Sequence, residues 1–222
     1  MYLSISTQPD IVFAVNHLCR FLDCFSRAHW EAAKQIVHYL KGSRDLRLVL
    51  GGEHTVQMLG YTDSDYASCP DTRHSTSRFC FSLGSGMVSW SSRQQKHITL
   101  STCEAKYVAA SEASQELVWL RHLLAGLDLR QPTASPLLCD NNSTITLSSN
   151  PAFHTKLKHI DTKYKFLCER VSDGQLYLDR VPSKDNIADA FTKALPRGAF
   201  VRFRMHMGLQ DSTRGGVVCQ EE

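Results

Sequence analysis

Residues Leu59–Ala67 read Leu-Gly-Tyr-Thr-Asp-Ser-Asp-Tyr-Ala, and this stretch decides how the rest of the sequence is interpreted. Its apolar lead-in predicts a strand that starts at Met58 and delivers Asp63 and Asp65. Side chains i and i+2 of a strand point to the same face, so both carboxylates can project from one side of a sheet. Carboxylates this close repel unless a cation lies between them or one binds a proton, and Mg²⁺ prefers such oxygen ligands. The alternative is a polar strand end with solvated acids, and the strand period does not choose between the two aspartates.

The composition predicts a globular protein with a sizeable core. The chain has 222 residues, of which 42% are hydrophobic and 21% charged, and its net charge is +3. That charge is too small to indicate a nucleic-acid partner by itself, so the clustering of basic residues must carry that argument. No apolar run approaches the roughly 18 residues of a membrane span, and we expect no membrane partner. The eight cysteines form no Cys-x-x-Cys pair, so we expect free thiols in a reducing compartment.

The first fifty residues predict a helical hairpin. Pro9-Asp10 opens an apolar-periodic run, and Ser26 can cap a second helix that Gly42 ends. We place a domain boundary at Gly51-Gly52. The expected division is a helical segment over 1–52, a main domain over 53–209 and a disordered polar tail over 210–222.

From Met58 onward the pattern predicts an α/β domain with a mixed five-stranded sheet and flanking helices. Three strands linked by tight turns come first, with Gly84-Ser85-Gly86 as the second turn. A long helix, a short strand, two helices, a strand and a last helix follow. Their predicted ranges are 101–127, 137–140, 141–150, 160–171, 175–181 and 185–195.

Four acids fall at special places in this arrangement: Asp63 on the first strand, Glu104 in the first turn of the long helix, Asp140 where the next strand ends, and Asp189 within the last helix. Each has a structural alternative, because Ser101-x-x-Glu104 is a capping box, Asp140 can cap a helix and Asp189 can face solvent. Taken together, four carboxylates from two strands and two helices can hold two Mg²⁺ ions, with Mn²⁺ as a substitute. Such a pair suits hydrolysis of a phosphodiester.

A series of motifs carries a strong resemblance to the ribonuclease H domain of copia-type LTR retrotransposon Pol polyproteins. The motifs span residues 58–209: Gly-Tyr-Thr-Asp-Ser-Asp-Tyr-Ala at 60–67, His-Ser-Thr-Ser-Arg-Phe at 74–79, Val-Ser-Trp-Ser-Ser-Arg-Gln-Gln-Lys at 88–96, Leu-Ser-Thr-Cys-Glu-Ala-Lys-Tyr at 100–107, Cys-Asp-Asn-Asn at 139–142, Lys-His-Ile-Asp-Thr-Lys-Tyr at 158–164 and Ala-Asp-Ala-Phe-Thr-Lys at 188–193. Residues 7–50 resemble the end of the preceding reverse transcriptase. The polymerase's Tyr-x-Asp-Asp motif is absent from this sequence, so we expect a fragment or a truncated copy.

The resemblance implies the ribonuclease H-like fold and two-metal hydrolysis of the RNA strand of RNA–DNA hybrids. It implies Asp63, rather than Asp65, as the metal ligand of the first strand, together with Glu104, Asp140 and Asp189. One departure concerns the loop at 181–186, which holds no histidine where many cellular ribonucleases H carry one. The implied partners are an RNA–DNA hybrid and the reverse transcriptase of the parent polyprotein. The implied location is intracellular, either in a cytoplasmic virus-like particle or in the nucleus.

Basic and polar side chains supply a predicted nucleic-acid surface. Four lysines gather between His154 and Lys165, where phosphate contact and a solvated helix face are the two interpretations. Two arginines flank the first strands, and three small polar residues are candidates for sensing the RNA 2′-hydroxyl. The predicted binding residues are Ser64, Arg73, Arg78, Asn141, Asn142, Lys156, Lys158, His159 and Lys163.

Two other functions stay open. One is that of a catalytically inactive nucleic-acid-binding remnant of a truncated retroelement. The other is that of an integrase-like strand-transfer enzyme of the same superfold. Cleavage of a labelled hybrid separates the first alternative from an active nuclease. An integrase-like enzyme would have its metal-binding glutamate in a late helix, whereas here Glu104 is early in the chain and Asp189 is late.

Overall fold

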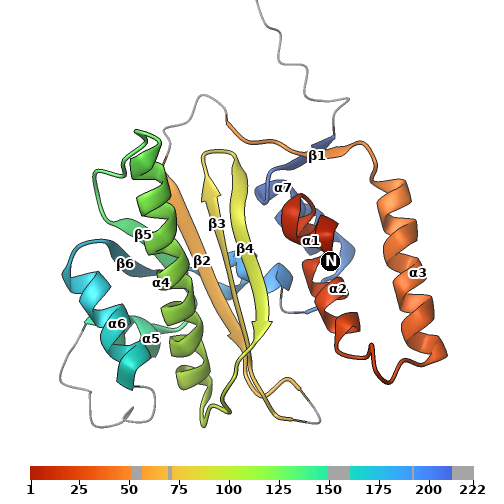
Figure 1. Cartoon of the computed structure of the whole chain (residues 1–222), viewed down its shortest axis with the longest axis horizontal. Coiled ribbons are helices and arrows are strands. Elements are labelled where there is room, and N and C mark those ends of the chain that lie inside the picture. The colour runs from red at the N-terminus through yellow and green to blue at the C-terminus, as the bar shows by residue number, and fades with distance from the viewer. Residues whose placement is uncertain (52–56, 70–71, 150–160, 192, 212–222) are drawn as a thin grey trace, which may run out of the picture.

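A computed structural model describes residues 1–51, 57–69, 72–149, 161–191 and 193–211, and a mixed sheet forms its centre (Figure 1). The five strands lie in the order β4-β3-β2-β5-β6. Strands β2, β3 and β4 form an antiparallel meander, while β5 runs parallel to β2, and β6 runs parallel to β5. Their bounds are β2 Met58–Asp65, β3 Thr76–Leu83, β4 Gly86–Gln94, β5 Ser135–Cys139 and β6 Leu176–Arg180. The predicted five-stranded mixed sheet is therefore confirmed.

The centre of the sheet is packed so closely at Gly60 that a larger residue would not fit. A Cβ atom built there would lie 2.5 Å from Cε1 of Phe81 and 3.0 Å from Cδ1 of Leu137. Strand β2 is thereby held against both neighbours, with Asp63 opposite Arg78 in the register. Because β2 and β5 are parallel, their carboxyl ends meet at one edge of the sheet, and this brings the residues after them together.

One face of the sheet is covered by α4, with α5 and α6 beside it (Figure 1). The bounds are α4 Thr102–Gly126, α5 Asn142–Ser149 and α6 Asp161–Ser172. An apolar stripe of α4 is buried from Ala105 through Leu124, and its last member, Leu127, just beyond the helix, is exposed. The stripe joins one core cluster with Met58, Phe81 and Leu137 of the sheet.

The other face is covered by short elements from both ends of the chain. Here η5 Ile187–Phe191, α7 Arg197–His206 and α2 Val12–Cys19 build a second core cluster. Cys80 belongs to this cluster and Phe81 to the first, as the two-residue period of a strand requires. Phe191, Phe203 and Met207 are its largest buried members.

The N-terminal segment contains the predicted helical hairpin. Helix α3 Arg27–Gly42 follows α2, and Ser26 caps it in a capping box with His29, as the sequence indicates at the helix start. The short elements α1 Tyr2–Ser6 and η1 Pro9–Ile11 precede the hairpin. Contacts with β4 tie the segment to the sheet: Trp90 Nε1 donates to Ser4 O at 2.7 Å, and Asn16 Nδ2 donates to Ser92 O at 2.9 Å.

A two-stranded ribbon joins the two ends of the chain. Strand β1 Leu46–Leu48 pairs with β7 Leu209–Asp211 in antiparallel register. The sequence pattern missed both strands, because three residues are too few to show alternation. The predicted tail was drawn from residue 210, whereas Gln210 and Asp211 form part of β7, and the rest of the tail lies outside the described residues.

The predicted last helix over 185–195 is wrong. Two 3₁₀ helices, η4 Ser183–Asp185 and η5, occupy most of this range, and Asn186 between them is extended. The Asn186 side chain donates to Thr62 O at 3.1 Å and accepts from the Ala188 N–H at 3.1 Å, so it holds the chain out of a continuous helix. Pro196 does not end a helix; it is the N-cap of α7, which the sequence pattern missed.

The described residues contain neither a membrane-spanning helix nor a disulfide bond. Every helix there is either too short or too polar to cross a bilayer. The seven cysteines among these residues are free, in agreement with the absence of paired cysteine spacing.

Candidate active site

Strand β2 ends at a cavity of about 410 Å³ that is lined by acids and by two lysines. Asp63 is 6% exposed, whereas the side chain of Asp65 is 44% exposed and lies 3.8 Å from Arg78 Nη2. Both carboxylates line the same cavity, with Asp63 inside it and Asp65 at the rim. The two-residue strand period thus placed both acids on one side of the sheet, and Asp65 is the one that water reaches.

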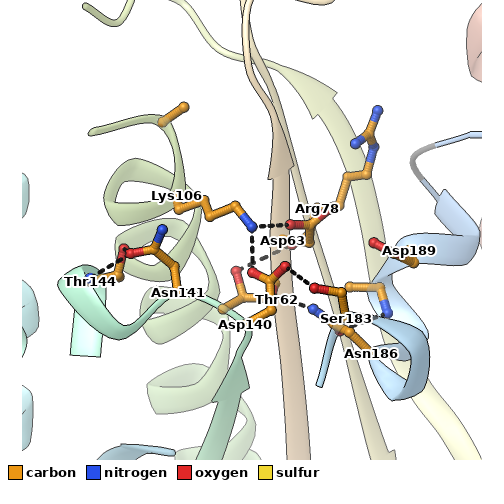
Figure 2. Close-up of polar contacts among 12 residues, drawn as sticks. Thr62, Asp63, Arg78, Lys106, Asp140, Asn141, Thr144, Ser183, Asn186 and Asp189 are labelled. Atoms are coloured by element: carbon orange, nitrogen blue, oxygen red, sulfur yellow. Dashed lines mark hydrogen bonds and ion pairs between the residues drawn. The ribbon is translucent and has the colours of Figure 1, made fainter. Parts of the chain in front are cut away.

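Asp140 reaches this cavity from the end of β5 (Figure 2). Its Oδ2 accepts a hydrogen bond from Ser183 Oγ at 2.9 Å, and its Oδ1 pairs with Lys106 Nζ. Ser183 belongs to η4, in the loop where no histidine occurs. This hydroxyl fixes the orientation of the Asp140 carboxylate, a role that the sequence pattern did not suggest for Ser183.

Asp189 completes the acidic group from η5, on the other side of β2 (Figure 2). It is 9% exposed and lies 2.9 Å from Nζ of Lys193, whose side chain is 61% exposed. Asn186 positions η5 through its hydrogen bond to the backbone of β2. Three of the four predicted acids, Asp63, Asp140 and Asp189, therefore lie around one cavity; we call them the aspartate cluster.

Lys106 lies within the aspartate cluster, and sequence reasoning missed it. Its Nζ is 3.3 Å from Asp63 Oδ1 and pairs even more closely with Asp140, so one ammonium group links the ends of β2 and β5 (Figure 2). Thr102 and Lys106 are four residues apart and share one side of α4, but nothing in the sequence marks that side as the one that faces the acids. Both residues line the cavity.

Glu104 points elsewhere. Its own N–H donates to Ser101 Oγ at 3.1 Å, which is one half of the capping box that the sequence offered as an alternative. Its Oε2 accepts the N–H of Leu100, one residue before the N-cap, at 2.7 Å. Glu104 lines a separate cavity with Gln95, Thr99 and Val108. The structure therefore does not bring Glu104 to the other three predicted ligands.

The electrostatics of the cluster follow from burial and from crowded negative charge. The pKa of Asp63 is raised to about 6, chiefly by burial; Lys106 lowers it, and the nearby Asp140 and Asp189 raise it. Burial alone would lower the pKa of Lys106, but Asp63 and Asp140 together raise it above its ordinary value. Both shifts describe one ammonium shared between carboxylates that repel one another.

The predicted nucleic-acid residues fall into three groups. Ser64 lines the cavity with a buried hydroxyl that has no hydrogen-bond partner among the described residues, and Arg73 and Asn142 are exposed. Asn141 is half-buried and caps α5 by accepting from the Thr144 N–H, and Arg78 is 2% exposed. Lys163 pairs with Glu112 at 2.7 Å, while Lys156, Lys158 and His159 lie outside the described residues.

The carboxylates at this cavity differ from the two-ion site that the sequence predicts. Carboxylate oxygens are suitable ligands for Mg²⁺, and three of them converge here. With Glu104 turned away and the Lys106 ammonium between Asp63 and Asp140, the side chains as they lie do not fit a pair of divalent ions. Within the described residues, no group of three or more His, Cys, Asp or Glu side chains is arranged to hold a metal ion.

Comparison with known proteins supplies the family. No family model matches the chain. The chain is 38% identical over 212 residues to the retrovirus-related Pol polyprotein from transposon TNT 1-94 of Nicotiana tabacum, covering 96% of this chain and 16% of that protein. It is 35% identical over 203 residues to the corresponding polyprotein from transposon RE2 of Arabidopsis thaliana, covering 91% of this chain and 14% of that protein. Among solved structures, LC11-RNase H1 in complex with RNA/DNA hybrid aligns with a TM-score of 0.46 and 14% identity, over 61% of this chain and 93% of that one.

The sheet order and the two parallel strands after the meander define an α/β protein of the ribonuclease H-like fold. The chain belongs to the family of retrovirus-related Pol polyproteins of copia-type transposons. It spans about one-sixth of the length of the curated relatives named above.

Proposed function

We propose that this chain is the ribonuclease H-type part of a transposon Pol polyprotein and hydrolyses the RNA strand of RNA–DNA hybrids during reverse transcription. One observation carries the proposal: in a chain of this family, Asp63, Asp140 and Asp189 converge from two strands and η5 on one cavity. Crowded negative charge supports it as well, because Asp65 lines the same cavity as the three aspartates. The cations near these four carboxylates are Lys106, the exposed Lys193 and the buried Arg78.

A divalent cation, Mg²⁺ or Mn²⁺, is part of the proposal. It would supply the activation of water that hydrolysis of a phosphodiester requires. The residues of this chain that would hold it are the three aspartates of the cluster, with Ser183 orienting Asp140. Lys106 must leave its place between Asp63 and Asp140 before the carboxylates can turn to an ion.

The hybrid is proposed to lie across the open cavity. The Ser64 hydroxyl, which has no hydrogen-bond partner in the part of the chain that the structure describes, lies inside the cavity and is suited to contact a sugar hydroxyl. The exposed Arg73 and Asn142 are candidates for contacts with the nucleic acid. Lys156, Lys158, His159 and Lys163 remain proposed phosphate contacts. The reverse transcriptase of the parent polyprotein is the proposed protein partner, and the proposed location is a cytoplasmic virus-like particle or the nucleus.

The division of the chain at Gly51-Gly52 is a proposal of the same kind. A chain starting at Gly52 should fold, because the core cluster under α4 uses no residue before Met58. Its melting temperature should fall, since Val12 leaves the second core cluster and β7 loses its partner β1. A chain that fails to fold would show instead that the two parts share one core.

The test of the proposed function is cleavage of an RNA–DNA hybrid labelled on the RNA strand, with Mg²⁺ titrated to saturation. Cleavage of the hybrid, with duplex DNA and duplex RNA left intact, is the expected result. Asp140→Asn keeps the shape of the side chain, removes its charge and should lower the rate by orders of magnitude. A wild-type rate in Asp140→Asn would exclude the aspartate cluster as the active site.

A second candidate function is favoured by the position of Lys106. A chain whose cluster is neutralised from within can bind a hybrid without cutting it, as a non-catalytic remnant. Binding of the hybrid with no cleavage at any Mg²⁺ concentration would favour this candidate over the hydrolase.

A further inference from the structure

The side of α4 that faces the aspartate cluster is set by the helix itself. Ala105 is buried against the sheet, and each residue along a helix turns by about 100°. Glu104 and Lys106 therefore leave the helix on opposite sides of Ala105. Glu104 turns toward the end of β4, where Gln95 and Thr99 lie, and Lys106 turns toward the end of β5.

The Lys106 ammonium lies between two buried or nearly buried carboxylates. It contacts Asp63 Oδ1 and Asp140 Oδ1, which come from two different strands, and its side chain is only 12% exposed. A positive charge at this point relieves the repulsion between the two carboxylates. A divalent ion bridging the same two oxygens would lie next to the ammonium, and two cations at such a distance repel strongly in a site that is screened from water.

We infer that Lys106 is a resident cation of this site, which competes with divalent ions for Asp63 and Asp140, and that position 106 rather than 104 is where a fourth carboxylate would complete a cation site. This inference rests on the proposed function, because it takes the aspartate cluster as the place where a cation acts. It also deepens that function, since it makes the charge at one position determine how readily the site accepts a divalent ion.

A purely structural salt bridge is the competing explanation for Lys106. Such a bridge would stabilise the fold and leave cation affinity untouched. The two explanations differ in a readout that does not need the nucleic acid, namely the affinity of the free protein for a divalent ion.

The experiment measures Mn²⁺ binding to the full chain by the loss of the free-ion electron paramagnetic resonance signal, in wild type, Lys106→Gln and Lys106→Glu. We expect affinity to rise in that order, by on the order of tenfold or more from wild type to Lys106→Glu, since a nearby positive charge is replaced by a negative one. Lys193→Gln is the matched control, because it removes a lysine from the same cavity without emptying the place between Asp63 and Asp140. Its exposed charge is screened by water, so its affinity should stay within about threefold of wild type.

Equal Mn²⁺ affinity in wild type and both Lys106 variants would overturn the inference, and so would an equal gain in Lys193→Gln. Lys106→Glu gathers four carboxylates and can be unstable without metal, so circular dichroism is recorded with and without Mn²⁺. If that variant does not fold, the comparison of Lys106→Gln with wild type decides alone. Hybrid binding is measured separately by fluorescence anisotropy without metal. If the wild-type chain does not bind the hybrid, the proposed function is contradicted. If the Mn²⁺ affinity is the same across the variants, the role of Lys106 is contradicted.

Discussion

Two buried aspartates, Asp10 and Asp63, differ in how the surrounding groups balance their negative charge. Asp10 accepts a hydrogen bond from the Tyr39 hydroxyl, and Arg204 Nη1 donates to the same hydroxyl at 3.3 Å, so one carboxylate faces one guanidinium through a neutral group. Asp63 shares Lys106 with Asp140 and has Asp189 nearby. Burial raises the pKa of both aspartates, but neighbouring carboxylates raise only that of Asp63 further.

The difference teaches how to separate a structural buried charge from a functional one. The Asp10 network joins η1, α3 and α7 and balances its own charge, so it holds segments together. Together with Asp65, the aspartate cluster has more carboxylates than the cations near it, which are Lys106, Lys193 and Arg78, and it opens into a cavity. Uncompensated charge in a cleft is typical of sites that bind or react, because selection for stability alone would remove it.

The largest expected effect separates the two aspartates of β2. Asp63→Asn should lower hybrid cleavage by more than about a hundredfold, whereas Asp65→Asn should lower it by about tenfold, the lower end of the range that is usual for residues outside the first set of contacts. Asp63 lies inside the cluster, and Asp65 at the rim is paired with Arg78. Single-turnover rates on labelled hybrid measure both. The reverse ranking would mean that Asp65 is the functional acid.

The next effect is on stability and depends on pH. The pKa of Asp63 is raised from 3.8 to about 6, so the folded protein binds more protons than the unfolded chain between these values. Stability should therefore be highest below pH 4 with respect to this group and fall as pH rises through about 6, by at most about 3 kcal/mol. Asp63→Asn removes this loss. In urea unfolding, the free energy of unfolding of Asp63→Asn minus that of wild type should therefore be larger at pH 8 than at pH 4.

The control for the pH prediction is Asp23→Asn, since Asp23 is exposed. If the stability of Asp63→Asn relative to wild type is instead lower at pH 8 than at pH 4, pairing with Lys106 outweighs the burial of charge.

A smaller effect is expected at the balanced aspartate. Tyr39→Phe removes the donor to Asp10 and the acceptor of Arg204, and should lower the free energy of unfolding by about 1–3 kcal/mol. Tyr177→Phe, at an exposed tyrosine, should stay within about 0.5 kcal/mol of wild type. Hybrid cleavage corrected for the folded fraction should not change in either variant. A cleavage defect in folded Tyr39→Phe would contradict a purely structural role for the Asp10 network.

The smallest effect concerns Lys163, whose charge is already paired with Glu112. Lys163→Ala should reduce the slope of log affinity for hybrid against log salt by less than about 1, the value for one full phosphate contact. Changing Lys156 and Lys158 together with Lys163 should flatten the slope further. An unchanged slope in the triple variant would identify the segment as a solvated face that does not touch the hybrid.

Periodicity predicted most of the sheet and little of the chemistry around it. Strand β2 and helix α4 are long, so their alternation and stripe were readable, and Asp63 and Asp140 followed from where strands end. The side of α4 that faces the cluster was not readable, because Glu104 and Lys106 flank Ala105 symmetrically in sequence. Only packing against β5 rather than β4 decides which of the two meets the aspartates. The break at Asn186 was equally hidden, since it depends on a hydrogen bond to Thr62, more than a hundred residues away in the chain.

The ammonium of Lys106 between two carboxylates also has a genetic consequence. Lysine and glutamate codons differ only in their first base, so a single nucleotide substitution at position 106 reverses the charge at the centre of the cavity. One point mutation therefore separates a site that neutralises itself from a site that needs an external cation. Copies of this sequence that differ at this one position would share a fold and differ in their dependence on metal.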